Sequence, residues 1–146
     1  MKGVLRLCSF FSVAVFLSLF ESTSAQAQPA PGLSEMWVYA VSSPGHLNGT
    51  WDYQSPGAMI SNGNHSGSWL RVAVFERGYA RSQRATFNGQ TMRLYHSEPL
   101  TGSNRRIYGW IQHYEIQTNF TTGRFAVSAT SIAQPWGTRS VGFNIR

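Results

Sequence analysis

Two short segments of the sequence carry the same pair of reactive side chains at the same spacing. His96-Ser97-Glu98 and His113-Tyr114-Glu115 each place an imidazole and a carboxylate two residues apart. In a β-strand, residues two apart point to the same side of the sheet. An imidazole that titrates near neutrality and a carboxylate whose pKa is raised by burial can transfer a proton at a ribose or glycosidic oxygen. The pairs His96, Glu98 and His113, Glu115 are therefore candidate catalytic residues of a metal-independent hydrolase or ribonuclease-like enzyme.

Two other interpretations compete with catalysis at these pairs. Histidine and glutamate at this spacing can ligate a metal, with His46 or His65 as further ligands. The same pattern also occurs on the solvent face of ordinary strands, where it forms cross-strand ion pairs. We rank this structural role first, catalysis second and metal binding third, and we predict no metal and no cofactor. No Walker or dinucleotide glycine motif is present, so we expect no nucleotide cofactor.

Arginine and tryptophan side chains suggest a binding surface. Every basic residue after Arg6 is arginine, whose planar guanidinium grips carboxylate, phosphate or sulfate groups by two hydrogen bonds. Arg105 and Arg106 lie in a predicted loop and form a candidate anion-binding patch, and they could also steady a phosphate transition state together with Arg93. Trp51 and Trp136 adjoin loops and are candidate exposed platforms for stacking. An acidic polymer or a cell-surface component is the partner that these residues favour.

The first residues are typical of an export signal. Lys2 and Arg6 are followed by an apolar run from Leu7 to Phe20, and then by small and polar residues that offer cleavage after Ala25 or Ala27. The apolar run is shorter than the roughly 20 residues that span a bilayer, and no other segment is long and apolar enough to do so. We therefore expect a signal peptide over residues 1–27, an extended proline-rich lead-in over 28–34, a single domain over 35–146, and a secreted product that is extracellular or periplasmic.

The residues that must position the candidate site form short strands. Aromatic and β-branched residues in alternating patterns predict strands over 35–42, 69–76, 84–87, 90–96, 106–118, 124–132 and 138–146. Asn88-Gly89 is a strong signal for a tight type I′ hairpin. Residues 43–68, rich in Gly, Asn, Ser and Pro, predict a long loop region around a short Trp51–Tyr53 segment, and such loops are a common place for function.

These elements indicate an all-β fold without disulfides. No long amphipathic helix is present to connect parallel strands, so the strands should pair antiparallel in a sandwich or a barrel. The one cysteine, Cys8, leaves with the signal peptide, so stability must come from packing and strand pairing.

The chain resembles the YolA-like family of small secreted bacterial proteins of unknown function. The resemblance covers most of the mature region and lies in Ala30–Leu33, Met36–Ser42, Asn64–Gly67, Tyr79–Gly89, Gly109-Trp110 and Pro135–Thr138. Some members carry a cysteine pair after the hairpin, where this chain has residues 98–106 and no cysteine. The resemblance implies export and a compact single domain, and it supplies no catalytic residues.

From the sequence we favour a non-enzymatic extracellular binding protein. The first alternative is the hydrolase or ribonuclease-like enzyme that uses the His/Glu pairs. The second is a secreted toxin or antimicrobial, which no strongly basic amphipathic helix supports.

Overall fold

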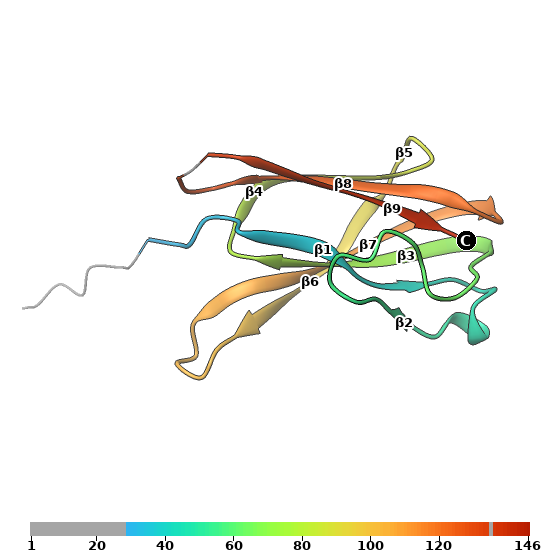
Figure 1. The fold of residues 1–146 in the computed structure, drawn as a ribbon, viewed down its shortest axis with the longest axis horizontal. Helices are drawn as coiled ribbons and strands as arrows, with labels where there is room; N and C mark the ends of the chain where they lie inside the picture. Colours follow the sequence, from blue (N-terminus) through green and yellow to red (C-terminus); the bar gives the residue numbers. More distant parts are fainter. Residues whose placement is uncertain (1–28, 135) are drawn as a thin grey trace, which may run out of the picture.

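The computed structural model describes residues 29–134 and 136–146, so the predicted signal peptide with Cys8 lies outside the described residues. Two antiparallel sheets pack face to face in this part of the chain (Figure 1). The all-β prediction is confirmed, and of the two architectures left open, the sandwich is the one observed. Among these residues the one helical element is a short 3-10 turn, η1 (Leu47–Gly49), and no helix is long and apolar enough to cross a membrane.

The first sheet has five strands in the order β2-β1-β3-β7-β6. Its strands are β1 (Glu35–Ser42), β2 (Asp52–Tyr53), β3 (Gly67–Arg77), β6 (Arg93–Thr101) and β7 (Ile107–Phe120). Every neighbouring pair is antiparallel. β6 forms one edge, where Pro99 and two register irregularities interrupt the regular ladder and discourage pairing with another chain.

The second sheet has four strands in the order β5-β4-β8-β9. They are β4 (Ala80–Phe87), β5 (Gln90–Thr91), β8 (Gly123–Ser131) and β9 (Thr138–Ile145). The expected inward alternation of the last strand is confirmed, because Phe143 and Ile145 are buried and Val141 packs against the core.

Apolar side chains from both sheets meet between them. The largest buried members are Phe87, Phe125 and Phe143 from the four-stranded sheet, and Leu70 and Tyr114 from the five-stranded sheet. Burying side chains of this size contributes about 1.5–3 kcal/mol each, which accounts for a stable domain without disulfides.

The hairpin at Asn88-Gly89 forms as predicted, but the strand after it differs from the prediction. Asn88 and Gly89 have φ angles of 48° and 81°, the left-handed values that a type I′ turn needs. The prediction of one strand over residues 90–96 is wrong, because β5 stops at Thr91 and β6 begins at Arg93 in the other sheet. Met92 lies between them and is 4% exposed as a member of the core, so the chain changes sheets at a buried residue.

The proline-rich lead-in is docked on the domain. Leu33 is buried, its backbone N–H donates to Oγ of Ser131, and the backbone N–H of Tyr79 donates to the carbonyl oxygen of Pro31. The lead-in is therefore tied to the connection between β3 and β4. At the other end of β1, residues 43–66 form the predicted loop region, with η1 and β2 as its regular elements.

Candidate functional site

The two candidate catalytic histidines lie side by side on the outer face of the five-stranded sheet. His96 on β6 pairs directly with His113 on β7, and their ring centroids are 5.3 Å apart. A bulge in β6 at Tyr95 lets the rings of both Tyr95 and His96 contact His113. Oε2 of Glu98 lies 3.8 Å from Nε2 of His113. The fold therefore assembles three of the four predicted residues, His96, Glu98 and His113, into one cluster.

His113 is the most enclosed member of this cluster. Its side chain is 14% exposed, and the ring of Trp51 meets it edge-on at a centroid distance of 5.7 Å. Neither ring nitrogen has a hydrogen-bond partner within the part of the chain that the structure describes. Burial lowers the pKa of His113, and the neighbouring His96 lowers it further. These two effects outweigh the opposing effect of Glu98 and favour the neutral form of the His113 imidazole.

Glu115, the fourth predicted residue, is held by arginines. It forms ion pairs with Arg93 and with Arg71, whose Nε lies 3.5 Å from Oε2 of Glu115. The guanidinium of Arg71 also lies over the rings of Trp69 and Tyr95, at 5.2 Å and 5.3 Å from their centroids. The hydrogen bond from Arg93 lowers the pKa of Glu115. Glu115 is thus a charged cross-strand partner and is poorly suited to be a general acid near neutrality.

The two candidate tryptophan platforms have different surroundings. Trp51 is half-buried and covers a small apolar cluster on the outer face of the five-stranded sheet, built on Ala40, Ala73 and Ile111. Trp136 is 59% exposed, and the guanidinium of Arg81 lies over its ring at 5.5 Å. Trp136 is therefore the more open of the two.

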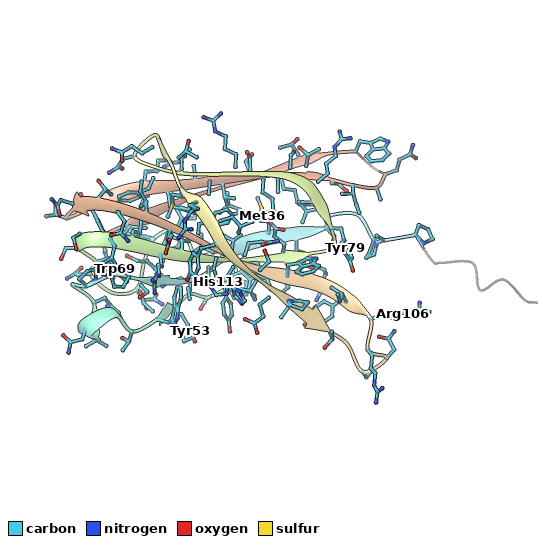
Figure 2. The ribbon with its side chains drawn as sticks, turned by 180° about the vertical axis from the view of Figure 1, so that it is seen from behind. Met36, Tyr53, Trp69, Tyr79, Arg106 and His113 are labelled. Atoms are coloured by element: carbon cyan, nitrogen blue, oxygen red, sulfur yellow. The ribbon has the colours of Figure 1, made fainter. Side chains whose placement is uncertain are left out.

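Arg105 and Arg106 lie in the turn that connects β6 to β7. The backbone N–H of Gly102 donates to the carbonyl oxygen of Arg106, and Arg105 has a left-handed φ of 60°. Figure 2 shows Arg106 at the outer end of this hairpin, away from His113. Closeness in sequence therefore does not bring these two arginines to the histidine cluster, whereas Arg93 pairs with Glu115 on the same face.

A buried polar network in the long loop region was not predicted. Oγ of Ser43 lies 3.0 Å from Nδ1 of His65, and Nε2 of His65 lies 3.1 Å from Oδ2 of Asp52. Burial alone would raise the pKa of Asp52, but hydrogen bonds from Gly63 and His65 outweigh it and lower the pKa. Ser43 is completely buried, so no substrate can reach its hydroxyl. The network resembles a catalytic triad in residue type, and its hydrogen bonds connect three separate positions of the loop region.

The same network accounts for His46 and His65, the two further metal-ligand candidates. Their rings stack at a centroid distance of 4.6 Å, and both nitrogens of His65 are engaged by Ser43 and Asp52. Within residues 29–134 and 136–146, no group of three or more His, Cys, Asp or Glu side chains is arranged to hold a metal ion.

Glu76 is a second residue that the sequence did not single out. Its side chain is completely buried between the sheets, and its Oε2 accepts a hydrogen bond of 2.7 Å from Nε2 of Gln83. Its other oxygen, Oε1, has no partner among the described residues. Burial raises the pKa of Glu76 to about 7. The alternation of β3 does place Glu76 on the inward face, so the pattern alone could have marked it as unusual.

Residues 28–145 match the domain of unknown function DUF4879. The chain belongs to this family. No curated protein and no solved structure matches it significantly. The family assignment is coarser than the YolA-like resemblance, which stays a prediction, and it leaves activity and ligand to the chemistry of the domain itself.

Charged residues of this DUF4879 domain are divided unequally between its two sheets. The strands of the five-stranded sheet contain all five acidic residues that follow Glu21 in the sequence, together with three arginines. The strands of the four-stranded sheet contain four arginines and no acidic residue. The acidic residues are Glu35, Asp52, Glu76, Glu98 and Glu115, and the four arginines are Arg81, Arg84, Arg124 and Arg139.

The outer face of the four-stranded sheet presents two of these arginines across a surface of small side chains. Arg84 and Arg124 line a hollow of about 380 Å³. The guanidinium of Arg124 lies over Gly142, where any side chain would collide with it, and reaches toward Oδ1 of Asn144 at 3.5 Å. The rest of the hollow is lined by Thr86, Ala126, Val127, Ser128, Ser140, Val141 and Gly142. We call this surface the basic face.

Proposed function

We propose that the protein is an exported, non-enzymatic binding protein that attaches to an acidic polymer through the basic face. The observation that carries this proposal is the unequal division of charge between the sheets. An arginine-bearing sheet without a single acidic residue attracts polyanions, and no carboxylate in that sheet competes for its guanidinium groups. Export would place the domain where polymers of the cell envelope and the surroundings are accessible.

The surface chemistry of the basic face suits a chain that lies flat across it. Arg84 and Arg124 supply planar donors, and Ser128 and Ser140, which lie in the same cross-strand row as Arg84, supply hydroxyl groups. The small neighbouring side chains leave room for a polymer backbone. Because Gly142 has no side chain, the guanidinium of Arg124 can lie close to the sheet. The hollow contains no aromatic side chain on which bases could stack, so the expected contacts are electrostatic and depend little on sequence.

The enzyme alternative receives less support from the geometry. The cluster of His96, Glu98 and His113 could accept a proton, but Glu115 is held as a charged carboxylate in ion pairs with Arg71 and Arg93. Because the pKa of His113 is lowered by burial, this residue is a poor proton donor at neutral pH. Acid–base catalysis needs both a donor and an acceptor at the reacting atoms, so a binding role fits this domain better.

The proposal predicts how salt affects binding to a model polyanion. We choose duplex DNA as the probe because its counterion release is well calibrated. Contacts from Arg84, Arg124 and one further arginine of the four-stranded sheet should give a slope of about −2.7 when the logarithm of affinity is plotted against the logarithm of salt concentration. Replacing both Arg84 and Arg124 with alanine should make this slope shallower by about two. Fluorescence anisotropy over a salt series measures both slopes.

The matched control removes the same charge at another place. Replacing both Arg105 and Arg106 with alanine lowers the net charge by the same amount as the Arg84 and Arg124 double variant, but at the β6–β7 turn. This variant should keep most of the salt dependence of the wild-type affinity for DNA. If the turn variant loses the slope instead, the binding patch is the one that the sequence suggested and not the basic face. If the wild-type protein does not bind at low salt, the acidic-polymer proposal itself is wrong.

A further inference from the structure

A pocket opens between the two sheets, beside the start of β4. Its volume is about 370 Å³, at the lower end of the range for small-molecule sites and large enough for one sugar ring. The side chains that line it come from both sheets and from the β3–β4 connection. They are Tyr79, Ala80, Arg81, Gln83, Ser97, Trp110 and Gln112.

This lining combines aromatic rings with amides and a hydroxyl. Trp110 and Tyr79 meet edge to face at a centroid distance of 6.0 Å, which holds both rings in place. The hydroxyl of Ser97 donates to Oε1 of Gln112, so the orientation of that amide is also fixed. Ordered amides beside an aromatic ring are suited to a ligand with an apolar ring face and several hydroxyl groups.

The buried carboxyl of Glu76 supports the pocket from behind. Gln83 both lines the pocket and donates to Oε2 of Glu76, while Gln83 Oε1 accepts a hydrogen bond of 3.4 Å from the hydroxyl of Tyr114. The groups that face Glu76 are Gln83 from β4 and Gln112 and Tyr114 from β7. Because the pKa of Glu76 is raised to about 7, its carboxyl is neutral in mildly acidic solution and does not repel an anionic ligand.

Arg81 brings positive charge to the same pocket. It lines the cavity, its side chain is exposed, and its guanidinium also lies over the ring of Trp136. Arg81 belongs to the four-stranded sheet, as do Arg84 and Arg124 of the basic face. Arg81 thus supplies a guanidinium to the pocket itself, separate from Arg84 and Arg124, which line the outer hollow.

We propose that this pocket binds one uronic acid residue, with the sugar ring against Trp110 and the carboxylate against Arg81. The inference rests on the proposed function and names the acidic polymer as an acidic polysaccharide. Nucleic acid has no sugar carboxylate that could pair with Arg81 in this pocket. An acidic polysaccharide and a nucleic acid can therefore be distinguished by whether the pocket binds a single uronic acid or a single nucleotide.

The test uses D-glucuronate as the probe, at mildly acidic pH, on the whole mature domain. D-glucose has the same ring without the carboxylate, acetate has a carboxylate without the ring, and uridine monophosphate represents nucleic acid. We expect glucuronate to shift the indole N–H resonance of Trp110 and the side-chain amide resonances of Gln83 and Gln112, with roughly millimolar affinity. Glucose should bind about tenfold more weakly, and acetate and the nucleotide should not shift these resonances.

Two variants and one control locate the site. Arg81→Gln changes an exposed side chain, so it should fold normally and should lower glucuronate affinity about tenfold, to the level of glucose. Trp110→Ala should abolish the response of the two amides. Arg105→Gln removes the same charge at the β6–β7 turn, outside both the pocket and the basic face, and should leave glucuronate binding unchanged.

Several results would overturn the inference while leaving the basic face intact. One such result is that glucuronate, at concentrations well above millimolar, leaves the resonances of Trp110, Gln83 and Gln112 unchanged. Another is that glucuronate binds the Arg81→Gln variant as tightly as the wild type. If glucose binds as tightly as glucuronate, the pocket does not recognise the carboxylate of the sugar. If acetate binds equally well, the site is a simple anion contact that does not recognise the sugar ring. Tighter binding of the nucleotide would indicate nucleic acid as the ligand. A failure of the polyanion salt test with intact glucuronate binding would instead reject the proposed function.

Discussion

At the scale of single residues, Glu76 places a carboxyl group where charge is costly. It lies completely buried between the sheets, with one oxygen bound to Gln83 and the other without a partner among the described residues. An ionised carboxylate in this position would lose its hydration without full compensation. The folded protein therefore favours the protonated form, and folding and proton binding are coupled at this residue.

Glu76→Gln should remove one part of the pH dependence of stability. Burial raises the pKa of Glu76 from 4.5 to about 7, so the folded state binds this proton more tightly than the unfolded state. The stability that this proton contributes is complete below about pH 4.5 and is lost as the pH rises through about 7. Relative to Glu76→Gln, the wild type should lose up to about 3 kcal/mol of unfolding free energy between about pH 5 and about pH 8. Urea unfolding at several pH values measures this difference.

The comparison with the variant is needed because histidines titrate in the opposite sense. Burial lowers the pKa values of His65 and His113, so their contribution to stability is present above about pH 6.5 and is lost as the pH falls. Glu35→Gln, at an exposed carboxylate, is the control and should follow the wild-type profile. Parallel profiles for the wild type and Glu76→Gln would show that the carboxyl is ionised in the folded state.

The candidate residues show what a local pattern can and cannot predict. The period of a strand correctly indicates that His96 with Glu98, and His113 with Glu115, point the same way. The register of β6 on β7 then brings His96 and Glu98 to His113, and it sets Glu115 opposite Arg93 instead. The network of Ser43, Asp52 and His65 has no such period, because its members come from one long loop region whose path depends on tertiary contacts. The residue types alone could identify these three side chains as polar candidates, but they could not predict that the side chains contact one another.

At the scale of elements, strands were predictable wherever burial alternates along the chain. β1 has the predicted bounds, and β8 (Gly123–Ser131) differs from the prediction by one residue at each end. The change of sheet at Met92 was not predictable, because alternation continues through residues 90–96 whichever sheet the strand joins. The choice depends on the space for Met92 between the sheets, and only the assembled core determines that space.

The β3–β4 connection gives a prediction about the docked lead-in. Gly78 has a φ of 96°, and a Cβ added there would overlap the carbonyl oxygen of Gly32. Gly57 has a similar φ of 82° but has nothing within 4 Å of an added Cβ. Gly57→Ala should cost about 1 kcal/mol of unfolding free energy from backbone strain. Gly78→Ala should cost about 1–3 kcal/mol more, because the lead-in must also move.

Thermal or urea unfolding of the two glycine variants measures this difference. Because both substitutions place alanine at a left-handed φ, their difference reports on the contact with the lead-in and not on the backbone strain that they share. Equal losses would indicate that the lead-in contributes nothing to the stability of the sandwich.

At the scale of the whole molecule, the two sheets divide structural and electrostatic roles. The five-stranded sheet carries ion pairs and an aromatic cluster on its outer face, where Figure 2 places Tyr53, Trp69 and His113. The four-stranded sheet carries arginines without opposite charges in its strands. Among the strands, the excess positive charge therefore lies in the four-stranded sheet.

A molecule that is charged on one side turns as it approaches an oppositely charged chain. The field of the basic face should orient the domain before contact, so a larger share of collisions with a polyanion should begin with Arg84 and Arg124 in front. Added salt should then slow association more than it speeds dissociation, and stopped-flow fluorescence can follow both rates. The variant that lacks both arginines should associate slowly at every salt concentration, whereas a salt effect confined to dissociation would mean that the domain arrives in random orientations.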